Sequence, residues 1–195
     1  MVTRAGLGPA HDISNAPPPA LVLVAFSLLS ACGHALGALE FSDGRDRFET
    51  RRDSLQERAS TAYTAVLDEG TQTFRGEAAL GAGDADRGVY LIGDAQVTID
   101  FENNTASGSM GDFGGFDTTE EYSDYQGTLI LQSGVLGAPN PNDVTGQITG
   151  TLTGEDYVIG VDAAWAGDLR GTPIRGVLGN TIGRESTFTL NGDRV

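Results

Sequence analysis

The chain of 195 residues has no lysine, a single cysteine and only two histidines, His11 and His34. Its 12 basic residues are therefore all arginine, and against 27 acidic residues they give a formal net charge of −15. A nucleic-acid-binding function is excluded because such proteins neutralise phosphates with many cations. The scarcity of cysteine and histidine also excludes a zinc site of these ligands and the Ser–His–Asp and Cys–His nucleophile systems.

Aromatic residues make up only 7% of the chain, whereas 28 residues are glycine, which is a poor helix former. This composition indicates an acidic, glycine-rich β protein, and the length fits one domain. A catalytic carboxylate pair is not excluded by counting, because 26 acids follow Cys32 and some of them must lie close together by chance. The presence of such a pair therefore gives no evidence for catalysis, and no enzymatic activity is expected.

An apolar run from Ala20 to Cys32 is too short to span a bilayer, which takes about 20 apolar residues, and it is typical of a signal-peptide core. It ends in Leu29-Ser-Ala-Cys32, which matches the bacterial lipobox, whose cysteine is lipidated after cleavage before it. We therefore predict a signal peptide of the lipoprotein type over residues 1–31, with Cys32 as the lipidated mature terminus. Gly33 in place of aspartate favours sorting to the outer membrane.

The region ahead of this apolar run departs from the usual signal-peptide pattern. It is 19 residues long, contains three consecutive prolines at 17–19 and carries only Arg4 as a positive charge. A misassigned start codon or a weak signal peptide would explain the difference.

A helix is predicted in the charge-rich stretch from Phe41 to Gly70, within a segment 32–70 that joins the anchor to the next module. Apolar residues recur there at spacings of 7, 4, 3 and 4, which is the helical period and predicts a helix of roughly 25 residues. Gly70 stands where a glycine commonly ends a helix. A competing interpretation takes Ser60 to Leu67 as a strand because its residues alternate. The apolar residues whose spacing predicts the helix are Phe48, Leu55, Ala59, Ala62 and Val66.

From Thr71 onward apolar and polar residues alternate, as they do in strands with one buried face. Glycines recur on the apolar face, where they permit the sharp bending of a narrow barrel. We predict a mainly β fold: an eight-stranded antiparallel up-and-down β-barrel over residues 71–195, preceded by one N-terminal helix. The predicted strands are Thr73–Leu80, Val89–Phe101, Thr105–Phe113, Gly127–Ser133, Val144–Thr153, Tyr157–Leu169, Pro173–Gly179 and Glu185–Leu190.

The interior of such a barrel should be filled by side chains, because eight strands enclose little more space than side chains occupy. This makes a large ligand cavity less favourable. A membrane-spanning barrel is disfavoured too, since only one side of the wall is apolar and that side fills the interior. The large residues expected inside are Phe74, Leu80, Phe101, Met110, Leu129, Leu131, Trp165, Leu178 and Phe188.

The order and spacing of these glycine-containing segments resemble the small barrel of transferrin-binding protein B and of other bacterial surface lipoproteins. The resemblance spans roughly residues 72–192 and implies a lipid-anchored surface barrel that binds a protein or a solute. The resemblance covers one barrel and no second lobe, so transferrin is not carried over as the expected partner. The segments that carry the resemblance are Thr73–Gly76, Ala95–Phe101, Thr105–Ser109, Gly146–Leu152, Trp165–Gly171 and Arg175–Gly179.

The segment from Gly111 to Tyr125 combines five acids with four aromatics and is expected to form an unusually long loop. Aromatic residues on exposed loops are typical of interfaces, so a binding loop for a cationic partner or a metal complex is one interpretation. The other is that Phe113 and Phe116 cover the barrel mouth while the acids are solvated. The candidate partner-binding residues are Phe116, Glu120, Glu121, Tyr122, Asp124 and Tyr125.

We therefore expect a lipid-anchored bacterial surface binding protein of the transferrin-binding protein-like type, which captures a protein or solute partner through barrel loops. The acidic charge favours a basic partner. No cofactor or metal is expected, and the chain is expected to be a monomer at the outer membrane, on its periplasmic or surface-exposed face. The alternative is a lipocalin-like carrier of a small hydrophobic ligand, which a cavity above about 300 Å³ would favour.

The first prediction concerns Cys32. Mass spectrometry of protein extracted from membranes should find a diacylglyceryl group on Cys32 as the first residue, because the apolar run and the Leu-Ser-Ala-Cys tetrapeptide are in register. An unmodified chain that begins at Met1 would contradict the prediction.

Overall fold

The computed structural model describes residues 19–66, 70–83, 88–137, 139–182 and 186–194, with side chains described from Ala35 to Thr181 except that of Tyr63. The chain divides into two compact units, Met1–Gly33 and His34–Val195. Within the described residues no helix has the length and hydropathy needed to cross a membrane. Residues 1–18 of the predicted signal peptide, and the side chains of the rest of it and of Cys32, lie outside the described part of the chain.

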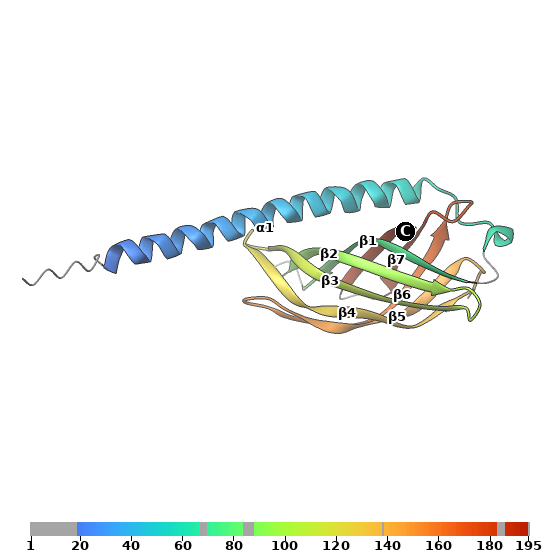
Figure 1. The fold of residues 1–195 in the computed structure, drawn as a ribbon. Coiled ribbons are helices and arrows are strands. Elements are labelled where there is room, and N and C mark those ends of the chain that lie inside the picture. Colours follow the sequence, from blue (N-terminus) through green and yellow to red (C-terminus); the bar gives the residue numbers. More distant parts are fainter. Residues whose placement is uncertain (1–18, 67–69, 84–87, 138, 183–185, 195) are drawn as a thin grey trace, which may run out of the picture. The chain divides into compact units, whose positions relative to one another are not determined.

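The fold consists of one long helix followed by a β-sheet (Figure 1). Helix α1 spans Pro19–Gln56, and a short 3₁₀ turn, η1, spans Tyr63–Ala65. The strands are β1 Thr71–Ala82, β2 Val89–Asp100, β3 Thr105–Asp117, β4 Tyr122–Leu136, β5 Asp143–Thr153, β6 Val158–Arg170, β7 Gly176–Ile182 and β8 Ser186–Arg194.

The strands form one antiparallel sheet that curls into a barrel. Strands β1 to β7 pair in chain order, each with the next. The last segment, β8, pairs with both β7 and β1 and closes the sheet. The prediction of a mainly β chain, with one helix ahead of an antiparallel barrel, is confirmed.

The barrel interior is one apolar cluster built from alternate residues of the strands, as the sequence predicts. On β2 the predicted inward set is buried throughout, from Val89 to Phe101. Leu178 is an exception: it is buried but lies outside this cluster, whereas its neighbour Val177 belongs to it, so Leu178 faces outward. The side chain of Phe188 lies outside the described residues.

Trp165 is the largest fully buried side chain and packs against two glycines. A Cβ atom at Gly179 would overlap the indole ring, and one at Gly167 would lie 2.8 Å from it. These two glycines pair with each other across β6 and β7, so together they open the space that the ring fills. Glycine on the inner face therefore provides room for a large side chain as well as curvature.

Helix α1 ends earlier than predicted, at Gln56, and the expectation that it continues toward Gly70 is wrong. The following residues bind the end of β6 instead: the Thr61 amide donates to the carbonyl of Leu169 at 2.8 Å, and its hydroxyl donates to the carbonyl of Gly171 at 2.8 Å. These bonds replace helical ones, so Ala59 and Ala62 do not extend the apolar face of the helix. Of the competing strand, only an isolated bridge between Ser60 and Arg170 forms.

The second prediction tests the barrel core. Trp165→Ala in the full chain should destabilise the fold by about 3–5 kcal/mol, because it removes a buried aromatic and leaves a cavity lined by glycine. Urea unfolding followed by circular dichroism measures this without depending on tryptophan fluorescence. The control is Val158→Ala, since Val158 is 71% exposed and should change stability by less than about 0.5 kcal/mol. Equal midpoints for the two variants would show that the inward register of β6 is wrong.

Candidate functional site

The segment from Gly111 to Tyr125 is a β-hairpin, so the prediction of a long loop there is wrong. Strand β3 continues to Asp117, β4 begins at Tyr122, and only four residues form the turn between them. The glycines of this segment allow close strand pairing: a Cβ at Gly115 would overlap the backbone of Tyr90 on β2. The sequence signal for a strand was hidden because glycine and aspartate interrupt the alternation.

The turn of this hairpin is organised by Asp117. Its carboxylate accepts hydrogen bonds from the Thr119 amide at 2.8 Å, the Thr119 hydroxyl at 2.7 Å and the Glu121 amide at 3.1 Å. The hydroxyl bond from Thr119 contributes most to holding the pKa of Asp117 below its ordinary value, followed by the amide bond from Glu121. The turn is therefore supported at neutral pH and loses this support only as the pH falls through the lowered pKa.

The six candidate residues separate into an exposed group and a packed group. Glu120 and Glu121 are exposed at the turn, and Asp124 is exposed on β4. Tyr122 is buried against α1, whereas Tyr125 is buried in the barrel core. Phe116 is half-buried beside Tyr122. The role of these residues in binding a partner stays a prediction.

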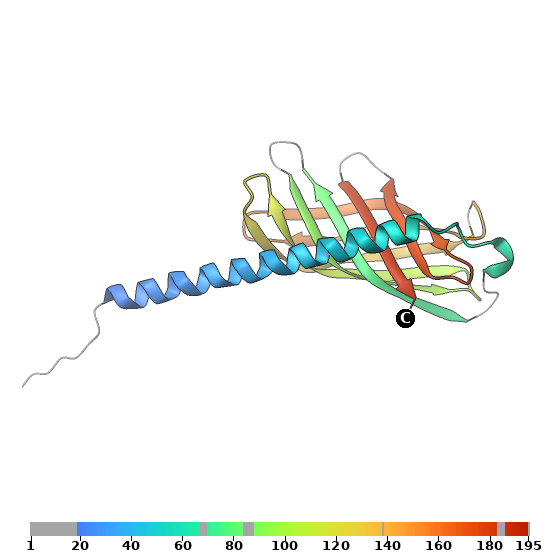
Figure 2. The ribbon, with the colours of Figure 1, turned by 90° about the horizontal axis from the view of Figure 1, so that it is seen from above.

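Helix α1 packs on the outer wall of the barrel through a second, smaller apolar cluster (Figures 1 and 2). The Phe41 ring meets the rings of Phe116 at 5.0 Å and Tyr90 at 6.1 Å, both edge to face. Such contacts stabilise a pair beyond the burial of its area. The aromatics of the hairpin thus hold the helix, which the sequence analysis missed because it placed them on a loop. The buried members of the cluster are Phe41, Phe48, Ala79, Ile92 and Tyr122.

Tyr122 fixes the position where helix and hairpin meet. Its hydroxyl donates to Asp124 Oδ1 at 2.6 Å. A Cβ atom at Gly37 of the helix or at Gly114 of β3 would overlap the Tyr122 side chain, so both positions admit the tyrosine only because they are glycine. Burial, and then the bond to Asp124, raise the pKa of Tyr122 well above its ordinary value, and the phenol stays a hydrogen-bond donor at neutral pH.

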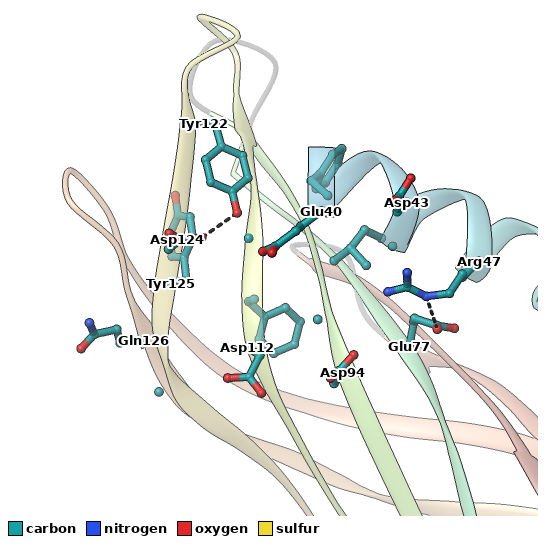
Figure 3. A pocket seen from close by; sticks show the side chains of 17 residues that line it. Glu40, Asp43, Arg47, Glu77, Asp94, Asp112, Tyr122, Asp124, Tyr125 and Gln126 are labelled. Carbon is teal, nitrogen blue, oxygen red and sulfur yellow. Dashed lines mark hydrogen bonds and ion pairs between the residues drawn. The ribbon is translucent and has the colours of Figure 1, made fainter. Parts of the chain in front are cut away.

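A groove of about 600 Å³ lies between α1 and the outer wall formed by β1 to β4 (Figure 3). Acidic side chains surround it from α1 and from each of these four strands, and Figure 3 shows Glu40 extending from the helix toward β3 and β4. A second groove of about 560 Å³ shares Glu77, Asp94 and Asp112 with the first, so the two adjoin along the wall. The acidic residues of the first groove are Glu40, Asp43, Glu77, Asp94, Asp112 and Asp124.

A backbone irregularity of β3 aims one of these acids, Asp112, outward. The β2–β3 register shifts between Ile92 and Asp94, and the β3–β4 register shifts between Met110 and Phe113. Asp112 sits in the second irregularity with φ of 53°, a left-handed conformation that is uncommon for residues other than glycine. Such bulges redirect side chains that regular strands would place elsewhere.

Glu77 is the one acid of the groove that is buried, and two arginines of α1 neutralise it. Arg47 Nε donates to Glu77 Oε1 at 3.4 Å, and Arg51 Nη1 donates to Glu77 Oε2. No hydrogen bond or ion pair is found from the described residues to the carboxylates of Glu40, Asp94 and Asp112, which are exposed. The groove therefore keeps an excess of negative charge after its internal ion pairs are counted.

The described residues contain no group of three His, Cys, Asp or Glu side chains close enough to hold a metal ion. The acids of the groove are spread over the helix and four strands rather than converging on one point (Figure 3). This arrangement fits a partner with an extended cationic surface better than it fits a single metal ion.

No family model and no curated protein sequence matches the chain. Among solved structures it is similar to the vaccine antigen transferrin-binding protein B of Haemophilus parasuis Hp5, a double mutant, with 13% identity and a TM-score of 0.47 over 69% of this chain and 27% of that one. Intact Ap-TbpB, with N and C lobes, matches at 12% identity and a TM-score of 0.45 over 69% and 28% of the two chains.

The solved structures to which the chain is similar are thus those of the protein that its sequence resembles. The chain spans little more than a quarter of the length of these two proteins, at 27% and 28%. Similarity of this degree identifies no partner, so function has to be argued from the surface of this chain.

The third prediction concerns the attachment of the helix. Glu77→Gln should weaken the fold by about 2 kcal/mol, because hydrogen bonds to a charged group are lost and two arginines are left beside an uncharged amide. Hydrogen exchange of the α1 amides from Phe41 to Leu55 should speed up more than that of the β5 amides. The control is Asp53→Asn, which removes an exposed pair with Arg52 and should cost less than about 0.5 kcal/mol. Unchanged protection of α1 in Glu77→Gln would show that this ion pair does not hold the helix.

Proposed function

We propose that the chain is a lipid-anchored bacterial surface protein that captures a basic protein or solute on the acidic outer wall of its barrel. The binding surface consists of the β3–β4 turn and the groove beside α1. The anchor is Cys32, the location is the outer membrane on its periplasmic or surface-exposed face, and the working form is a monomer. No catalytic step and no cofactor form part of this proposal.

The excess of negative charge on the wall is the observation that supports this function best. Residues 88–169 contain 13 acids and no arginine. Of the arginines that line the two grooves, Arg47 and Arg51 are bound to Glu77, and Arg75 donates to the uncharged side chain of Gln96. A field of one sign accelerates the encounter with an oppositely charged partner and disfavours partners of like charge.

The position of the exposed acids further supports capture at the hairpin. Glu120, Glu121 and Asp124 project from a turn and strand that Asp117 and the α1 contacts hold in place. A preorganised surface loses little conformational entropy when it binds. Phe116 and Tyr122 contribute by fixing the position of the hairpin. They contact the partner directly only through the parts of their rings that are exposed.

The alternative of a lipocalin-like carrier is not favoured. A small hydrophobic ligand takes a largely apolar cavity of about 300 Å³ or more. The barrel interior is packed by the apolar cluster around Trp165, and both grooves lie outside it and are lined by charged residues. The space that a carrier would use is therefore filled by side chains.

The fourth prediction tests the acidic wall. The triple variant Glu120→Gln, Glu121→Gln, Asp124→Asn should keep its unfolding midpoint, because exposed charges contribute little to stability. Its affinity for a fluorescent oligoarginine probe should fall about tenfold or more, since three negative charges are removed from one surface. Binding by the wild type should weaken as salt shortens the Debye length, which is about 8 Å at physiological ionic strength.

A matched control separates local recognition from net charge. Asp53→Asn, Glu57→Gln, Glu102→Gln removes the same number of exposed charges from the helix end and the β2–β3 turn. If both triple variants lose affinity equally, the effect is one of net charge and the hairpin is not the site. The binding of partners that the mature chain captures from surface extract is then compared between the same two triple variants.

A further inference from the structure

Two leucines of α1 are exposed to solvent, and both lie close to Ala35, the first residue whose side chain is described. Leu36 is 62% exposed and Leu39 is 64% exposed, values high for leucine on a helix that packs along a domain. Other apolar residues of the same helix are buried, among them Phe41, Phe48 and Leu55. Helix α1 therefore has two apolar faces, of which the barrel covers only one.

The spacing of these residues places the two faces on opposite sides of the helix. A helix turns by about 100° per residue, so the nine residues from Leu39 to Phe48 correspond to about 180°. The five residues from Leu36 to Phe41 correspond to about 140°. The leucine face thus points away from the barrel, and among the residues that the structure describes none covers it.

The sequence around the two leucines indicates what covers this face. Between Cys32 and Leu39 there is no Asp, Glu, Lys or Arg, whereas Glu40, Asp43 and Asp46 follow directly. Leu36 is four residues from Cys32, a distance of at most about 14 Å for an extended chain. A lipid on Cys32 would therefore keep Leu36 close to the bilayer whatever the conformation of the residues between them.

We propose that Leu36 and Leu39 form a membrane-contacting face, which lies in the interface of the bilayer that holds the lipid of Cys32. The proposal rests on the lipid-anchor part of the proposed function, and it adds a second contact through the protein itself. Interfacial helices bury their apolar face about 5–10 Å deep, and stable attachment commonly combines a lipid chain with a second signal. The carboxylates that begin at Glu40 stay in water and limit the depth of insertion.

This attachment fixes which side of the barrel faces the membrane. Because the leucine face and the Phe41 face are opposite, the first turns of this part of α1 lie between the bilayer and the barrel wall. An acidic chain is repelled by anionic lipid, so a zwitterionic surface is the compatible one. The acidic groove is then held away from the lipid and stays accessible.

The fifth prediction uses tryptophan as a depth probe in the full mature chain, purified from membranes with its modification. Leu36→Trp and Leu39→Trp are reconstituted into vesicles of phosphatidylcholine brominated on the acyl chains. Each added tryptophan should be quenched by about half or more, as expected for an interfacial apolar face. The native Trp165 is buried and should give a constant, unquenched background, recorded from the wild type.

The matched control is Thr50→Trp, which lies 11 residues beyond Leu39 at nearly the same angle around the helix and is exposed. It should stay unquenched, because Asp43 and Asp46 separate it from the apolar part of the face. Equal quenching at positions 36, 39 and 50, or none at all three, would overturn the proposal. A blue shift of Leu36→Trp that needs no vesicles and grows with protein concentration would assign the face to a second copy of the chain.

Mass spectrometry of the same samples keeps the two hypotheses separate. A chain that carries diacylglyceryl on Cys32 but shows no quenching at positions 36 and 39 refutes the membrane-contacting face and leaves the anchor intact. A chain without the modification that is nevertheless quenched refutes the anchor and supports the face by itself.

Discussion

A sheet with apolar residues on one face only has to hide that face, and in this chain it does so by closing on itself. The strands alternate so regularly that curling the sheet buries one complete set of side chains around Trp165. Glycines such as Gly167 and Gly179 make a closure this narrow possible, because any side chain there would overlap the indole or the neighbouring strand. The other face then becomes the outer wall and carries the acids.

Closure leaves little apolar surface with which to hold the helix. The outer wall offers α1 a patch of a few residues, including Ile92 and Tyr122, which is small beside the barrel core. A buried Glu77 supplements it by binding Arg47 and Arg51. A buried carboxylate is costly unless it is paired, so this contact specifies where the helix lies more than it adds stability. The same pairing removes cations from the groove and leaves its other acids unopposed.

The sequence predicted the barrel because alternation is a local signal that survives along most of the strands. It failed where tertiary contacts outweigh local preference: Thr61 binds the end of β6 and ends the helical register, and the glycines around Phe113 hide a strand behind a loop-like composition. The groove could not be predicted, because Glu40, Asp94 and Asp112 are far apart in the chain and the register shifts of β3 aim Asp112 outward. Exposed acids on the hairpin, by contrast, were readable from the sequence.

Helix α1 connects two surfaces of this protein that remain available to partners. One side of it contributes Glu40 and Asp43 to the acidic groove, while Leu36 and Leu39 point away from the barrel. Because Phe41 is locked between Phe116 and Tyr90, the helix cannot rotate without breaking its aromatic contacts. Any surface that fixes the leucine face therefore also fixes the direction in which the groove opens. The orientation of the acidic wall is in this way a property of the helix rather than of the barrel.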